Sequence, residues 1–241
     1  MFFQKKPVVK FWTENELLLQ QKDLWPQPAS KFFPEWFKKI KPTVRPTLEG
    51  KRTIRDCPVF AEYLTQGYII PMWCDTILKF NSNDRTWQWN TSAFVPRKGI
   101  SSWDDHDDSQ YIDFIPVENK ENMVVLKAIC PWHVKVSKGY SLYQQQMYYH
   151  YNSDWEILPG SIHSDLYHEI NQQVLIKKAD KEIFIPRGAP FVWYIPYKRE
   201  KYNLQVVKQG EEEYLDYIKG QGSISSHLLN GYKKLVRKNR K

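Results

Sequence analysis

The stretch that decides the fold is residues 139–197, which read GYSLYQQQMYYHYNSDWEILPGSIHSDLYHEINQQVLIKKADKEIFIPRGAPFVWYIPY. Its β-branched and aromatic residues gather in three runs, at 174–176, 183–185 and 191–195. Such residues favour a pleated, half-buried surface. Turn residues separate the runs, with Pro159-Gly160 before the first and Arg187-Gly188 before the last. Because no helical period survives across these turns, the stretch predicts sheet.

The same stretch resembles the β-fold shared by trimeric dUTPases and dCTP deaminases. Those families carry a Gly-x-Asp-Leu turn, a Pro-Gly-x-Ile-Asp-x-Asp-Tyr-x-Gly hairpin and a strand that ends in Gly-Asp-Arg-Ile-Ala-Gln. Their places are taken here by Gly139–Leu142, Pro159–Asp165 and Ile185–Gly188. The resemblance covers about a quarter of the 241 residues. It implies a mainly β fold, a distorted antiparallel β-barrel or β-clip with short flanking helices.

The positions that carry chemistry in those families differ in this chain. The resemblance implies an Asp that activates the attacking water and a Tyr under the deoxyribose, and this chain has His163 and Leu166 there. Tyr167 is displaced by one residue, which turns a strand side chain to the opposite face, and the Asp of the first turn is Ser141. A general base must lie within hydrogen-bond reach of its proton. We therefore predict no catalytic residue and keep one candidate ligand pocket, formed by Tyr140, His163, Asp165 and Tyr167.

Most of the chain also resembles an uncharacterised family of phage and bacterial proteins. In that family an IPEWYKK segment and a CP…GYIIP segment precede the β-rich block. The corresponding residues here are Phe33–Lys39 and the stretch from Cys57 to Pro71. This resemblance implies a phage setting and brings no established activity.

Composition limits the class of protein. Aromatic residues make up 15% of the chain, more than a solvated tail would carry, and the 15 Pro exceed the 10 Gly, which favours extended segments and turns. Cys57, Cys74 and Cys130 are odd in number and form no Cys-x-x-Cys pair, a pattern typical of buried thiols in a reducing compartment. No apolar run approaches the roughly 18 residues of a membrane span. The N-terminus lacks the apolar segment of a signal peptide.

We divide the chain into three predicted parts: an extended N-terminal arm at 1–50, a β-rich core domain at 51–200, and a C-terminal helix and basic arm at 201–241. Short helices are predicted at 14–21, with Thr13 as its cap, at 57–66 and at 211–219, followed by a hinge at 220–223. Strands outside the central stretch are predicted at 68–80, 86–89, 123–129 and 133–136. Three tryptophans are assigned to the core or to a subunit interface: Trp73, Trp87 and Trp89.

The two ends of the chain are the predicted partner-binding regions. Aromatic residues mark the N-terminal arm: Phe32, Phe33, Trp36 and Phe37. Leucines inside a basic run mark the tail: Leu228, Leu235, Arg237, Lys238 and Arg240. The alternatives are that the rings only pin the arm to the body and that the charge run is a solvated end. The net charge of +8 favours an acidic partner or phosphate.

An acidic run, Trp103–Ser109, raises the question of a metal site. Calcium loops space their carboxylates at alternate positions and need a glycine for the sharp turn, and the run WDDHDDS has neither feature. We interpret it as a solvated loop and predict neither a metal site nor a cofactor.

Three functional hypotheses follow. The first is a non-enzymatic phage virion or virion-assembly protein that acts through protein–protein contacts. The alternatives are a dUTPase-like domain that binds or hydrolyses nucleotides, and a nucleic-acid-binding protein that uses the basic tail. The predicted partners are other virion proteins or further copies of the chain, as in a trimer, and no membrane. The predicted location is the virion or the host cytoplasm.

Overall fold

The computed structural model describes residues 6–41, 53–92 and 101–225. The described chain is mainly β, with four antiparallel sheets and few short helices, which confirms the predicted fold class. It divides into two compact units. The first comprises the described residues of Met1–Phe32 and Gln66–Arg199, and the second those of Phe33–Thr65 and Glu200–Lys241.

The largest sheet lies in the first unit and is built around one long strand. Its order is β11 (Gly160–Ile162), β9 (Tyr140–Gln145), β14 (Pro190–Lys198), β3 (Tyr68–Pro71) and β2 (Gln27–Pro28). Trp193 in β14 pairs with Gln145 on one side and with Ile69 on the other. Because β14 has neighbours at both edges, it reads as a nearly continuous apolar run, as buried central strands do.

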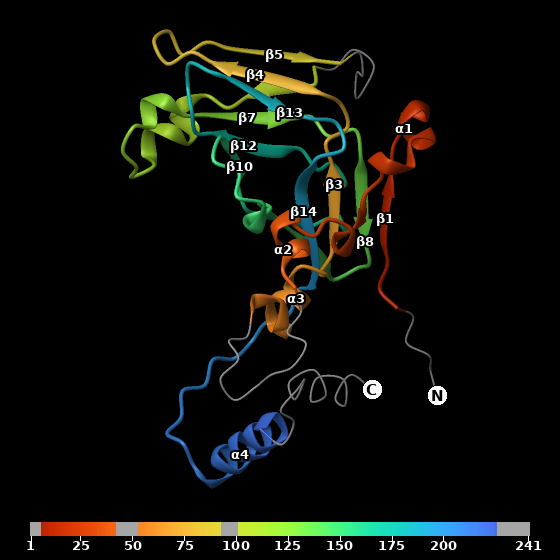
Figure 1. Cartoon of the computed structure of the whole chain (residues 1–241), viewed down its shortest axis with the longest axis vertical. Coiled ribbons are helices and arrows are strands. Elements are labelled where there is room, and N and C mark those ends of the chain that lie inside the picture. The colour runs from red at the N-terminus through yellow and green to blue at the C-terminus, as the bar shows by residue number, and fades with distance from the viewer. Residues whose placement is uncertain (1–5, 42–52, 93–100, 226–241) are drawn as a thin grey trace. The chain divides into compact units, whose positions relative to one another are not determined.

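Three further sheets complete the first unit (Figure 1). One has the order β10 (Trp155–Ile157), β12 (Gln172–Ile176), β7 (Val124–Ala128) and β6 (Trp103–Asp105). Another is β13 (Glu182–Ile185), β4 (Thr76–Phe80) and β5 (Trp87–Thr91), and the last pairs β1 (Val9–Trp12) with β8 (His133–Val136). Each described sheet is open, with two end strands, and none closes into a barrel.

The core of the first unit joins residues from all four sheets. Along β4, buried residues alternate with exposed ones, so one face of its sheet turns inward. Phe191 lies at the centre of a ring cluster, with its centroid 5.7 Å from that of Trp73, 6.4 Å from Trp103 and 5.4 Å from Trp155. These rings are all buried. The prediction that Trp73 belongs to the core is thereby confirmed.

A polar network crosses this core. The Tyr194 hydroxyl donates to Gln144 Oε1 at 2.8 Å and accepts from Gln172 Nε2 at 2.8 Å. All three residues are buried. Burial raises the pKa of the Tyr194 hydroxyl well above its usual value, because the charged form would lie in a poorly solvated site. The hydroxyl therefore remains a hydrogen-bond donor.

Residues 9–31, predicted to lie within an extended arm, contribute to the first unit. Leu18 and Leu24 are fully buried in the main core. The helix α1 spans Glu16–Gln20, and its N-cap is Asn15, whose side chain accepts a hydrogen bond from the Leu18 amide at 3.0 Å. The predicted cap at Thr13 is wrong by two residues, since the Thr13 hydroxyl instead accepts from the Asn15 amide.

The described helices of the second unit have five, six and 15 residues. They are α2 (Glu35–Lys39), α3 (Pro58–Tyr63) and α4 (Glu211–Ser225). Single 3₁₀ turns lie at Lys22–Leu24, Ala29–Lys31, Ile54–Asp56, Asp108–Gln110, Ile112–Phe114, Lys120–Asn122 and Tyr148–His150 across the two units. The predicted hinge at 220–223 is wrong, because α4 runs through both glycines; each weakens a helix by only about 1 kcal/mol. None of the described helices combines the length and the apolar composition that a membrane-spanning helix requires.

The acidic run is not a loop throughout. Its first residues form β6, in which Asp104 lies opposite Lys127 of β7, an opposite-charge pair that favours strand pairing. Asp108 forms an ion pair with Arg85. Within the described residues, no group of three or more His, Cys, Asp or Glu side chains is arranged to hold a metal ion. Of the cysteines, Cys74 and Cys130 are buried and Cys57 is exposed.

Candidate functional site

The turn that carries the predicted ligand pocket holds a nearly buried carboxylate. The Asp165 side chain is only 4% exposed, and both of its oxygens accept from Arg199: Oδ1 from Nη1 at 2.7 Å and Oδ2 from Nη2 at 2.5 Å. The Gly139 amide also donates to Oδ2, at 2.9 Å. Arg199 first, and then the Gly139 amide, hold the pKa of the Asp165 carboxyl well below its usual range. The carboxylate is therefore charged and engaged at neutral pH.

Arg199 extends this contact to two strand ends. Its Nη1 also donates to the Ser141 hydroxyl at 3.0 Å and to the Tyr140 carbonyl at 3.2 Å, and its amide donates to the Gly139 carbonyl at 2.8 Å. The start of β9, the end of β14 and the turn at 163–167 are thus tied together. We call Asp165, Arg199 and Gly139 the sheet-end clamp. Its geometry is that of a structural bidentate pair.

The other predicted pocket residues point to separate environments. The His163 carbonyl accepts from the amides of Leu166 and Tyr167, at 2.9 and 3.0 Å, while the His163 side chain is exposed. The Tyr167 hydroxyl donates to Glu169 at 3.2 Å, and Tyr140 is half-buried against the core. Neither of the two cavities described next is lined by any of the four residues. Their assignment as a ligand site stays a prediction.

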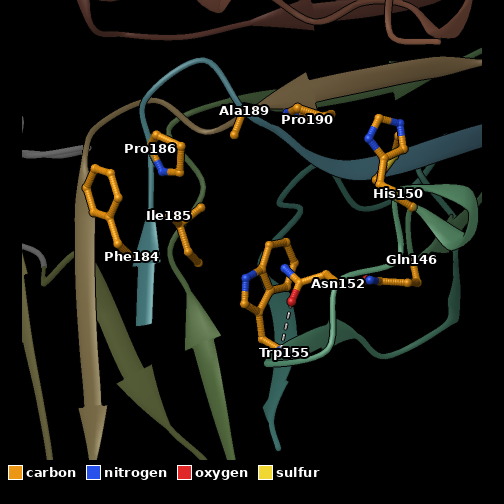
Figure 2. A pocket seen from close by; sticks show the side chains of 10 residues that line it. Gln146, His150, Asn152, Trp155, Phe184, Ile185, Pro186, Ala189 and Pro190 are labelled. Atoms are coloured by element: carbon orange, nitrogen blue, oxygen red, sulfur yellow. Dashed lines mark hydrogen bonds between the residues drawn. The ribbon is translucent and has the colours of Figure 1, made fainter. Parts of the chain in front are cut away.

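A small cavity lies where the loop after β9 meets the turn between β13 and β14 (Figure 2). Its volume is about 150 Å³. The residues that line it are Gln146, Met147, His150, Asn152, Trp155, Phe184, Ile185, Pro186, Ala189 and Pro190. Ligand pockets are usually of roughly 300–1,000 Å³, so this cavity fits a small group and not a nucleotide.

The polar side chains of this cavity also hold its walls. Gln146 Oε1 accepts from the Ile157 amide at 2.7 Å. Asn152 Oδ1 accepts from the Trp155 amide at 3.3 Å, the contact drawn as a dashed line in Figure 2. His150 Nε2 lies 3.0 Å from the Phe32 carbonyl oxygen. These contacts position the loop around the cavity, and they account for polar residues in it without a ligand.

A larger, more open hollow of about 430 Å³ is rimmed by lysines. Lys177, Lys178 and Lys181 line it. Lys178 and Lys181 both contact Asp154 at 2.8 Å, and their hydrogen bonds lower the pKa of that carboxyl to about 2. Lys177 pairs with Glu156 at 3.1 Å. The rim is therefore partly neutralised from within the chain, which weakens it as an anion site.

Three of the four predicted docking rings of the N-terminal region pack together in the second unit. Phe33 and Trp36 lie 5.6 and 5.9 Å from Phe37, measured between ring centroids. Phe37 is buried and lies 5.2 Å from Phe60 of α3. Phe32, in the first unit, is half-buried. The predicted tail residues Leu228, Leu235, Arg237, Lys238 and Arg240 lie outside the described residues.

The sequence analysis missed an exposed segment that directly follows β14. Residues 200–210 have no secondary structure and are exposed throughout. Tyr202 is 82% exposed, Leu204 90% and Val206 87%. The signal was available, because apolar residues alternate with Asn203 and Gln205, the period-2 pattern of a half-buried strand. The segment has the residue pattern of a strand but belongs to no sheet of the described residues.

Comparisons with known proteins found similar solved structures only. No protein-family model and no curated protein matches the chain. The solved EIAV dUTPase is similar over 61% of this chain and 86% of its own, with 9% identity and a TM-score of 0.32. A variant dUTPase of phage phi11 of S. aureus is similar over 38% of this chain and 80% of its own, with 12% identity and a TM-score of 0.27. These neighbours are of the kind that the sequence resemblance predicted. Likenesses at these identities and TM-scores assign no activity to this chain.

Proposed function

We propose that this chain is a non-enzymatic protein of a phage particle or of its assembly apparatus, and that it acts through protein–protein contacts. The observation that carries the proposal is a run of exposed apolar side chains in the second unit. Their exposed fractions range from 44% to 90%, and they are Tyr202, Leu204, Val206, Val207, Tyr214, Leu215, Tyr217 and Ile218. Exposed apolar side chains in such number along one stretch of chain are typical of interaction sites.

The exposed apolar face of α4 is a second support for the proposal. It has 15 residues, and isolated helices of that length are marginal in water. Tyr214, Leu215 and Ile218 fall on one face and are 50, 46 and 44% exposed. Burying this face against another protein would stabilise the helix.

Two features of the first unit speak for binding over nucleotide hydrolysis. Asp165 is engaged by Arg199 and Gly139, so its carboxylate is not available to orient a water. Tyr167 lies one residue after the position at which the resembled families carry their Tyr, and its hydroxyl contacts Glu169. The phage setting is supported by the resemblance at Phe33–Lys39 and in the stretch from Cys57 to Pro71.

The test is incorporation into particles. Mass spectrometry of purified particles and assembly intermediates should detect the chain. Ile218→Lys should lower its incorporation at least tenfold, since it puts a charge into the apolar face of α4. The matched control is Asp216→Asn, which raises the net charge equally on another face of the helix and should leave incorporation unchanged.

Absence of the chain from both particles and intermediates would overturn the proposal. So would turnover of dUTP or dCTP that disappears in His163→Ala, which would favour the nucleotide hydrolase. Binding to duplex DNA with a steep salt dependence would favour the nucleic-acid alternative.

A further inference from the structure

The inference begins with the strand-like segment 202–206, which reads YNLQV. A half-buried strand places alternate residues on opposite faces, so Tyr202, Leu204 and Val206 would form an apolar face and Asn203 and Gln205 a polar one. In the structure the three apolar side chains are between 82% and 90% exposed. The segment thus carries the pattern of an added strand, and the described chain gives it no sheet.

A sheet edge in the first unit fits this segment. β5 ends the sheet β13-β4-β5, and no described strand pairs with its outer edge. Two backbone hydrogen bonds flank the pairing of β4 and β5: the Asn81 amide donates to the Thr86 carbonyl at 2.8 Å, and the Ser92 amide donates to the Asp75 carbonyl at 3.0 Å. The antiparallel alternation therefore turns the backbone groups of Trp87, Trp89 and Thr91 outward.

β5 also lacks the usual protection of an edge. Proteins guard edge strands with charges, prolines or short length. The other described end strands carry a charge or a proline, except β11, which has only three residues. β5 has five residues, WQWNT, with neither feature, and Trp89 is 39% exposed. Such an edge is open to strand addition.

The two five-residue sequences are complementary position by position. In β5 the residues on the inner face are Trp87, Trp89 and Thr91, and those on the outer face are Gln88 and Asn90. An antiparallel partner strand centred on Leu204 would bring that side chain beside Trp89. Its polar residues Asn203 and Gln205 would lie beside the side chains of Asn90 and Gln88 on the outer face. The added strand would cover the exposed part of Trp89.

The segment cannot reach β5 of its own chain. The turn before β14 lies beside the start of β4, because the Arg187 amide donates to the side chain of Asp75, the residue before β4, at 2.8 Å. β14 then runs away from it for nine residues, about 26 Å at about 3.3 Å per residue (Figure 1). From Arg199 to Leu204 the chain spans at most about 18 Å. The partner strand must come from another molecule.

We propose that residues 202–206 of one copy add as an antiparallel strand to the outer edge of β5 in a second copy. The strand exchange deepens the proposed function and rests on it in one respect, that the exposed segment is a protein contact. It names the partner as a further copy of this chain. Leu204 is the central apolar contact, and Gln205 lies beside Gln88.

The first test is the oligomeric state of the full chain by light scattering over a range of concentrations. The chain should self-associate, and Leu204→Asp should shift the midpoint for association at least tenfold toward higher concentration. Leu17→Asp is the matched control: it makes the same chemical change at a leucine that is 61% exposed in α1, outside both the segment and β5. A monomer at all concentrations, or equal effects of the two variants, would overturn the proposal.

The second test locates the contact. Chains with Gln205→Cys are mixed with differently sized chains that carry Gln88→Cys, both in a Cys57→Ser background, and oxidised mildly. A cross-linked pair of unequal chains is expected. The control is Glu182→Cys, because Glu182 stands in the same cross-strand row as Gln88 but at the opposite edge of the sheet. Equal cross-linking to both sites, or none, would contradict the proposal.

The two proposals fail separately. A chain that is monomeric but still enters particles would sink the strand exchange and leave the proposed function standing. A chain that forms the cross-linked oligomer but is absent from particles and intermediates would do the reverse.

Discussion

β14 and the segment that follows it contain the same kinds of residue in opposite environments. Phe191 to Tyr194 in β14 are at most 2% exposed, and Trp193 and Tyr194 pair with strands on both sides. Only a few residues later, Tyr202, Leu204 and Val206 are more than 80% exposed. The boundary between them is Arg199, which is bound to Asp165 in the sheet-end clamp. The comparison teaches that a β pattern records a capacity for pairing, and that the chain itself need not supply the partner.

The strongest way to test this comparison is to truncate one side chain on each side of the boundary. Phe191→Ala should lower the free energy of unfolding by about 3–5 kcal/mol, because it leaves a cavity among Trp73, Trp103 and Trp155. Leu204→Ala should change it by no more than about 0.5 kcal/mol at concentrations where the chain is monomeric. Denaturant unfolding measures both. Comparable losses would mean that the exposed segment is packed in solution.

An intermediate effect is expected inside β14 without any loss of volume. Tyr194→Phe removes the hydroxyl that joins Gln144 to Gln172 and leaves a buried amide oxygen without its donor. The cost should be about 1–3 kcal/mol. The same change at Tyr202, which is 82% exposed, is the control and should have no measurable effect. If Tyr194→Phe is neutral, the network does not contribute to the stability of the sheet.

The fold could be predicted from the sequence wherever local pattern and burial agree. The predicted strand at 133–136 matches β8, and Trp73 lies in the core. Boundaries failed where a neighbouring residue competed, as Asn15 did with Thr13 for the helix cap. The prediction that the acidic run is a loop was wrong for a tertiary reason, since Asp104 pairs with Lys127 in a sheet. Local propensity does not contain such cross-strand contacts.

The candidate site was less accessible to sequence reasoning. Asp165 was predicted for a ligand pocket, but its partner Arg199 lies 34 residues later in the sequence. No local spacing indicates such a pair. The small cavity at His150 is lined by residues from two separate parts of the chain, 146–155 and 184–190, and no local pattern brings these together. The segment 202–206 had a readable pattern, yet its meaning depended on knowing that no described strand pairs with it.

The smallest of the three effects on stability is expected at the boundary itself, and it depends on pH. Asp165→Asn keeps one oxygen acceptor for Arg199 and Gly139 but removes the charge. The free energy of unfolding at pH 7 should therefore fall by less than in Tyr194→Phe. In the folded chain the pKa of the Asp165 carboxyl lies below its value of about 3.9 in an unfolded chain. The charged clamp therefore contributes fully above that value, and its contribution is lost as the pH falls below it.

Urea midpoints of the parent chain and Asp165→Asn at pH 7, 4 and 3 measure this contribution. The difference between them should be largest at pH 7 and shrink toward pH 3. Asp154→Asn is the matched control at an exposed ion pair. The pKa of Asp154 is lowered to about 2, so its contribution also declines below about pH 4. Its size should stay within about 1 kcal/mol, because solvent screens exposed pairs. A difference for Asp165→Asn that does not depend on pH would mean that the turn at 163–167 ends the sheet by shape alone, without the charge on Asp165.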